Sequence, residues 1–72
     1  MRILNFSVAI SEQEMLAIYS GAIKNVIVVT DSGLRVQVRG DHFKAFVTRD
    51  GVRGRFRKIL DDNNRLVKLE KL

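Results

Sequence analysis

The sequence has no cysteine, no proline and no tryptophan among its 72 residues. Without cysteine the chain can form neither a disulfide framework nor a thiolate metal site, which fits a reducing compartment. Aromatic residues are also few, with one tyrosine and four phenylalanines. Three of these phenylalanines fall at positions expected in the core: Phe43, Phe46 and Phe56. The chain therefore shows no aromatic platform on which nucleic-acid bases could stack.

Long apolar runs are also missing. No stretch approaches the roughly 20 apolar residues that a membrane-spanning helix needs. The residues after Met1 contain neither the apolar segment nor the cleavage site of a signal peptide. We therefore expect a cytoplasmic protein without a membrane partner. With 72 residues the chain forms a single domain, residues 1–72, and a core of this size leaves only about 3–5 kcal/mol of net stability.

Positive charge is abundant and unevenly distributed. The formal net charge is +5 at pH 7. Residues 1–34 carry a balance of −1, whereas residues 35–72 carry a balance of +6. This asymmetry favours an anionic partner but does not identify one.

Residues 24–39 predict a β-hairpin. Residues 24–30 form an apolar run of mostly β-branched side chains, and residues 34–39 alternate between apolar and polar. The intervening residues 31–33 form a turn in which Gly33 can take the left-handed conformation. The first arm is apolar on both faces, so each face should be covered. We expect a helix on one side and, on the other, a curled sheet or a second copy of the chain.

The segment that follows Ser11 predicts an α-helix with complete end signals. Ser11 and Glu14 have the spacing of a capping box, and Ile10 and Met15 have that of a hydrophobic staple. Gly21 is the expected left-handed stop. The apolar stripe of this helix should cover one face of the hairpin, and its members are Met15, Ile18, Tyr19 and Ala22.

The remaining segments predict three more strands and a short helix. Arg2–Ile10 and residues 52–60 have strand patterns, and residues 65–72 form the last strand. Residues 41–47 predict a short helix capped by Asp41 that buries Phe43, Phe46 and Val47. The order predicts an α+β fold, with the N-terminal helix packed on a mostly antiparallel sheet of about five short strands. That sheet is either open or curled into a small barrel.

A set of segments spread along the chain resembles one known protein family. The residues that carry the resemblance are Phe6-Ser-Val-Ala-Ile-Ser11, Tyr19-Ser-Gly21, Asn25-Val26, Arg35-Val-Gln37, Phe46-Val-Thr-Arg-Asp-Gly-Val-Arg-Gly-Arg-Phe56, Asn64 and Leu69-Glu-Lys-Leu72. Over its full length the chain is similar to domain-of-unknown-function family 2835, a family of short stand-alone bacterial proteins. The resemblance implies a cytoplasmic domain with no established activity or ligand, so it transfers no catalytic residues.

Six polar residues form the candidate binding site. They occupy alternate positions on two predicted strands: Arg35, Gln37 and Arg39 on one, and Arg53, Arg55 and Arg57 on the other. If the two faces align, five guanidiniums form one surface suited to phosphate oxygens. We therefore expect a non-enzymatic binding or regulatory module whose basic sheet face binds a polyanion, either a nucleic acid or a nucleotide. The alternative is an ordinary solvated face on which arginine stems cover apolar surface.

No catalytic or metal-binding motif accompanies these arginines. His42 is the only histidine, and Asp41 and Asp50 do not complete a set of metal ligands around it. We therefore predict no enzymatic activity, no cofactor and no metal. A second hypothesis is a protein–protein interaction module or a self-associating module, without a nucleic-acid role. It rests on the small size of the chain and on the first hairpin arm, which is apolar on both faces.

Overall fold

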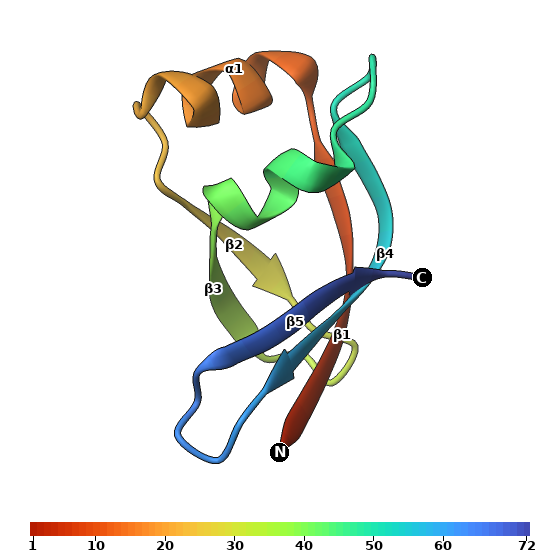
Figure 1. Cartoon of the computed structure of the whole chain (residues 1–72). Helices are drawn as coiled ribbons and strands as arrows, with labels where there is room; N and C mark the ends of the chain where they lie inside the picture. The colour runs from red at the N-terminus through yellow and green to blue at the C-terminus, as the bar shows by residue number, and fades with distance from the viewer.

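The computed structural model describes the whole chain, Met1–Leu72, and has an α+β architecture. The elements in order are β1 (Arg2–Ile10), α1 (Glu12–Ser20), β2 (Asn25–Val29), β3 (Arg35–Arg39), the 3-10 helix η1 (Gly40–Phe46), β4 (Val52–Leu60) and β5 (Leu66–Lys71) (Figure 1). The predicted fold class is confirmed. The first strand and the strand at residues 52–60 have the predicted bounds.

The five strands form two antiparallel sheets (Figure 1). One sheet has the order β1-β4-β5, and the other is the β2–β3 hairpin. A single antiparallel bridge, Phe6–Thr30, joins β1 to the residue that follows β2. The Asp31 amide donates to the Asn5 carbonyl beside this bridge at 2.9 Å. Because the sheets are joined at this one point, they do not close into a barrel.

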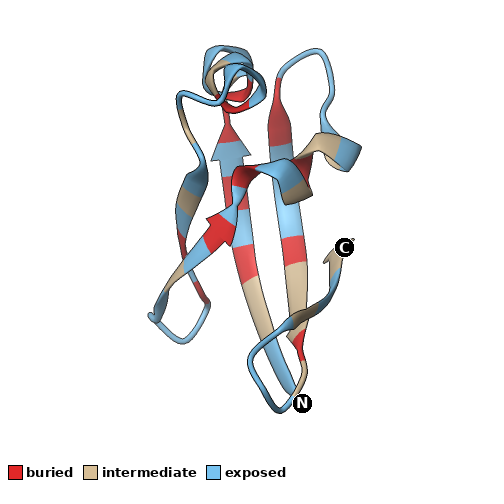
Figure 2. Ribbon diagram, turned by 60° about the vertical axis from the view of Figure 1, so that its left-hand side comes forward, coloured by how far each residue is buried: buried red, intermediate tan, exposed pale blue.

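Aromatic side chains fill the space between the sheets. Phe6 on β1 and Phe56 on β4 are paired in register, and their ring centroids are 6.2 Å apart. Phe43 of η1 packs edge-on against Phe56 at 5.5 Å, and all three side chains are fully buried. Val28 and Val38 bring the inner face of the hairpin into the same cluster. Buried and exposed residues alternate along the second half of β1, whereas β4 buries only every fourth residue, Val52, Phe56 and Leu60 (Figure 2).

Helix α1 has the predicted caps but a narrower buried stripe than predicted. The Ser11 hydroxyl accepts from the Glu14 amide at 3.1 Å, and the Ser11 amide donates to the Glu14 carboxylate at 3.3 Å. Gly21 ends the helix with a φ of +86°. Met15 and Ile18 are buried, but Tyr19 is 49 % exposed. The other predicted member of the stripe, Ala22, lies beyond the helix and is exposed, because Gly21 has already turned the chain.

The position of α1 differs from the prediction. The helix lies across one end of the molecule against η1, rather than over a face of the hairpin (Figure 1). Its Ile18 side chain packs so closely on Gly40 that a Cβ there would be 2.8 Å from the Ile18 Cγ2. The inner face of the hairpin instead packs into the core cluster with β1, β4 and η1. The outer face of β2 is left open, with Ile27 59 % and Val29 56 % exposed.

The predicted helix at residues 41–47 is a 3-10 helix at Gly40–Phe46. It buries Phe43, whereas Val47 is 40 % exposed. Asp41 does not cap this helix, and no other side chain does. The Asp41 carboxylate instead forms an ion pair with the Lys44 ammonium at 2.9 Å, three residues along the same helix.

Gly51, just before β4, lies very close to the backbone at the end of β1. Its φ is +97°, and a Cβ there would lie 2.0 Å from the Ile10 carbonyl oxygen. Gly33 is a matched control, because its φ is +88° but a Cβ would meet nothing within 4 Å. We expect Gly33→Ala to lower the free energy of unfolding by about 1–2 kcal/mol through backbone strain alone. Gly51→Ala should cost more than about 3 kcal/mol, because the backbone must also move.

Urea denaturation followed by circular dichroism measures both losses. Equal losses for the two variants would contradict the close approach of Gly51 to β1.

Candidate functional site

The two arginine rows of the candidate site lie in different sheets. Strand β3 carries Arg35, Gln37 and Arg39 and pairs only with β2, whereas β4 carries Arg53, Arg55 and Arg57 and pairs with β1 and β5. The expectation that both rows share one sheet face is therefore wrong. The physical reason is that β1 and β2 come between them and are joined by only one bridge. The five guanidiniums form two separate groups.

The β3 row has few fixed contacts. Arg35, Gln37 and Arg39 are exposed and lie opposite Val29, Ile27 and Asn25 of β2. The Arg39 guanidinium is 3.7 Å from the Asp41 carboxylate, a loose pair that Asp41 shares with Lys44. No carboxylate forms an ion pair with Arg35, so it is the one free guanidinium of this row.

The β4 row stands beside small side chains. Arg53, Arg55 and Arg57 are paired in register with Ala9, Ser7 and Asn5 of β1. Alternate residues of a strand are roughly 7 Å apart. The three arginines are therefore evenly spaced along β4, next to the short side chains of β1. Of the three, only Arg55 forms an ion pair with a carboxylate. Arg53 is exposed and has no carboxylate opposite it on β1, whereas Arg57 is partly buried and lies opposite Glu70 of β5 without forming an ion pair.

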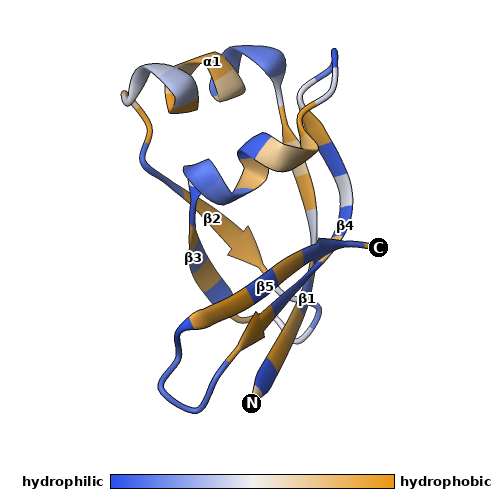
Figure 3. Cartoon of the chain, in the orientation of Figure 1, coloured by the Kyte–Doolittle hydropathy of each residue, from blue (hydrophilic) through white to orange (hydrophobic).

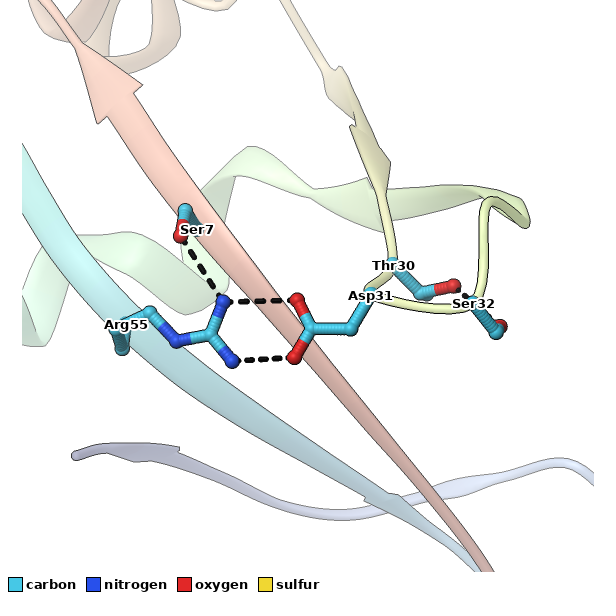
Figure 4. A network of polar contacts seen from close by, with 5 residues as sticks. All are labelled: Ser7, Thr30, Asp31, Ser32 and Arg55. Carbon is cyan, nitrogen blue, oxygen red and sulfur yellow. Dashed lines mark hydrogen bonds and ion pairs between the residues drawn. The ribbon is translucent and has the colours of Figure 1, made fainter.

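Arg55 connects the two sheets across β1 (Figure 4). Its guanidinium makes a bidentate pair with the Asp31 carboxylate, and the Nη1–Oδ1 distance is 2.8 Å. The same Nη1 donates to the Ser7 hydroxyl at 3.1 Å. This pairing lowers the pKa of Asp31, because the hydrogen bond from Arg55 stabilises the carboxylate. Arg55 is therefore tied to the fold and is the least available guanidinium of the β4 row.

The partners of Arg55 were not identified from the sequence. Asp31 had been assigned only to the hairpin turn, and Ser7 only to the first strand. Arg55 is 24 residues from Asp31 along the chain, so no local spacing connects the two. The turn also holds Asp31 in place, since the Thr30 and Ser32 hydroxyls are 2.9 Å apart and the Leu34 amide donates to the Thr30 hydroxyl at 3.1 Å.

His42 of η1 and Lys58 of β4 are both partly buried, and Lys58 lies on the face of β4 opposite the arginine row. Burial lowers the pKa of His42, and the neighbouring charges of Arg39 and Lys58 lower it further. Burial also lowers the pKa of Lys58, whose ammonium donates to the Gln37 carbonyl at 3.3 Å. The His42 Nδ1 atom is buried without a hydrogen-bond partner. No group of three or more acidic, histidine or cysteine side chains gathers at any place in the chain.

The Arg55–Asp31 pair predicts a specific pH dependence of stability. Because the pKa of folded Asp31 lies below its ordinary value of 3.8, the pair stabilises the fold above that value. This stabilisation is lost as pH falls through the lower, folded-state pKa. We expect Asp31→Asn to be less stable than wild type at pH 7, and the difference to disappear towards about pH 2.

Urea denaturation at a series of pH values measures this difference. Asp50→Asn is the control, because no ion pair involves Asp50. A gap between wild type and Asp31→Asn that stays constant down to pH 2 would argue against the pair.

The comparisons with known proteins identify a family but no ligand. No helix of the chain combines the length and the apolar character needed to cross a membrane. No curated protein and no solved structure matches the sequence. The model of one family, described as "Protein of unknown function (DUF2835)", matches residues 2–72. This match covers essentially the whole chain, which therefore belongs to the DUF2835 family.

Proposed function

We propose that this protein is a non-enzymatic binding or regulatory module, and that the β4 arginine row binds a polyanion such as a nucleic acid or a nucleotide. One observation carries the proposal: neither Arg53 nor Arg57 forms an ion pair. Both project beside small residues of β1, although Arg57 also lies opposite Glu70 of β5 in register. Arginine is suited to phosphate because its planar fork can donate two hydrogen bonds at once. Arg55 contributes mainly by holding the hairpin turn against β1.

The distribution of charge supports the same proposal. Residues 35–72 hold a balance of +6 and contain both arginine rows. Because β3 and β4 lie in separate sheets, a long polyanion could contact Arg35 as a second site, away from the main one. The proposal includes a cytoplasmic location, where nucleic acids and nucleotides are present.

The buried aromatic residues limit the mode of binding. Phe6, Phe43 and Phe56 are completely buried, so none of them can stack on a base from the surface. The half-exposed Tyr19 belongs to α1 and not to the strand that carries the arginine row. The proposed contacts are therefore made to phosphate groups, which carry no direct sequence information. We expect binding that depends strongly on salt and weakly on nucleotide sequence.

Reversing the two free charges tests this proposal. We expect Arg53→Glu/Arg57→Glu to weaken binding of a fluorescein-labelled single-stranded oligonucleotide by on the order of tenfold or more. The plot of log K against log salt concentration should also become shallower by about 1.4, which corresponds to two lost phosphate contacts. Fluorescence anisotropy over a range of salt concentrations measures both quantities.

A charge-matched variant separates the site from the net charge. Arg49→Glu/Arg65→Glu changes the net charge by the same amount, at two exposed positions outside β4. Its affinity should fall much less. Equal losses in the two double variants would mean that only overall charge matters, and no binding by wild type at low salt would exclude the function.

A second candidate function is protein–protein interaction, including self-association. The observation that favours it is the outer face of β2, where Ile27 and Val29 stay more than half exposed. Figure 3 shows β2 as an almost uniformly hydrophobic strand. Sedimentation velocity at increasing protein concentration tests whether a second copy covers this face. A dimer that is lost in Ile27→Asp would support self-association, and a monomer at every concentration would count against it.

A further inference from the structure

A groove separates β1 from β2 where the two strands diverge. Its volume is about 350 Å³, and it is lined by residues 7–10 of β1 and 26–29 of β2, together with Glu14 of α1. It begins next to the Phe6–Thr30 bridge and continues towards α1. Beyond that bridge no strand pairs with the side of β1 that faces β2.

Both walls of the groove present unpaired strand edges. The Asn5 carbonyl accepts from the Asp31 amide, so odd-numbered residues of β1, including Ala9, direct their backbone groups towards β2. On the other wall, the Thr30 amide donates to Leu34 and uses the side of β2 that faces β3. Odd-numbered residues of β2, such as Ile27, therefore direct their backbone groups into the groove. Two free edges that face each other can accept an extended chain.

The side chains of the groove define what that chain should contain. Val8, Ile10 and Val28 are almost fully buried and form an apolar floor. A strand lying in the groove would turn every second side chain towards this floor and the others outwards. The inward positions therefore suit small or β-branched apolar residues.

Arg55 indicates which outward residues fit. From β4 it extends across β1 above Ser7 and binds Asp31 on the far side (Figure 4). Arg53 lies two residues away on the same face of β4, opposite Ala9, which is smaller than serine. No carboxylate pairs with Arg53. The same reach across β1 would bring the Arg53 guanidinium to an acidic side chain on a strand in the groove.

We propose that this groove binds an extended segment of a partner protein in which acidic residues alternate with β-branched apolar residues. The segment adds as a strand between β1 and β2, and Arg53 pairs with one of its carboxylates. A second copy of this chain fits the groove poorly, because none of its strands alternates acidic with apolar residues. The proposal deepens the protein-interaction candidate and does not depend on polyanion binding.

Amide hydrogen exchange tests the free edges directly. In the protein alone, the amides of Ala9 and Ile27 should exchange rapidly, whereas those of Val8 and Val28, which point towards β4 and β3, should be protected. The probe is an acetylated, amidated heptapeptide in which aspartate and valine alternate, with aspartate at both ends and valine at the centre. Its addition should slow exchange at Ala9 and Ile27 and leave Val8 and Val28 unchanged.

Two altered peptides separate strand addition from simple charge attraction. Proline in place of the central valine removes a backbone donor and should abolish binding. Lysine in place of every aspartate should weaken binding by on the order of tenfold. If the proline peptide binds as well as the parent, or if Ala9 and Ile27 are already protected in the free protein at all concentrations, the proposal is overturned.

Charge reversal at Arg53 provides the matched variant. Arg53→Glu should weaken binding of the aspartate peptide and strengthen binding of the lysine peptide. Such a reversal of preference cannot come from a loss of stability. Arg65→Glu carries the same charge change outside β4 and should leave the preference for aspartate in place. Unchanged preference in Arg53→Glu would overturn the proposed pairing. Protection of Ala9 that rises with protein concentration and no peptide would point to a second copy instead.

Oligonucleotide binding is measured on the same samples. If the wild-type protein binds the oligonucleotide but not the aspartate peptide, only the groove proposal is overturned. The reverse result would reject polyanion binding and support the groove.

Discussion

A single backbone bridge, Phe6–Thr30, governs how the two sheets of this protein are arranged. It attaches the turn end of the β2–β3 hairpin to β1, and beyond it the strands separate. The aromatic cluster around Phe56 fills the space between the sheets. A complete ladder between β1 and β2 would have made one continuous curved sheet with both arginine rows on its outer face. With one bridge, the rows are separated and a groove remains between the strands.

The arginines of β4 illustrate how one strand can serve both structure and binding. Arg55 is bound to Asp31 and Ser7 and supports the bridge from outside the core. Arg53 and Arg57 have the same orientation but form no ion pair, although Arg57 lies opposite Glu70 of β5 in register. Arg55 differs from its neighbours because of where Asp31 lies. The hairpin turn places this one carboxylate within reach of Arg55. Charge patterns in a sequence therefore indicate a surface, but they do not tell which charges on it are free.

Most of the local structure could be predicted from the sequence, because its causes act over a few residues. The capping box joins Ser11 to Glu14, only three residues apart. The alternation along β4 identified its outward arginines, and Gly33 marked the hairpin turn with a φ of +88°. The prediction that Tyr19 is buried was wrong, although it also came from local spacing along the helix. A helical stripe states which residues share a face, whereas burial depends on what lies opposite that face.

Local signals in the chain were sufficient to predict the α+β class, the order of the elements, the ends of α1 and the direction of each arginine row. These follow from side-chain periodicity and from hydrogen bonds between near neighbours. Long-range packing was needed to show that the rows lie in different sheets, that Asp31 neutralises Arg55 and that β1 and β2 leave an open groove. Each of these depends on contacts between residues far apart in the chain, and such contacts are set by how the sheets pack around the core and not by the residues next to them in sequence.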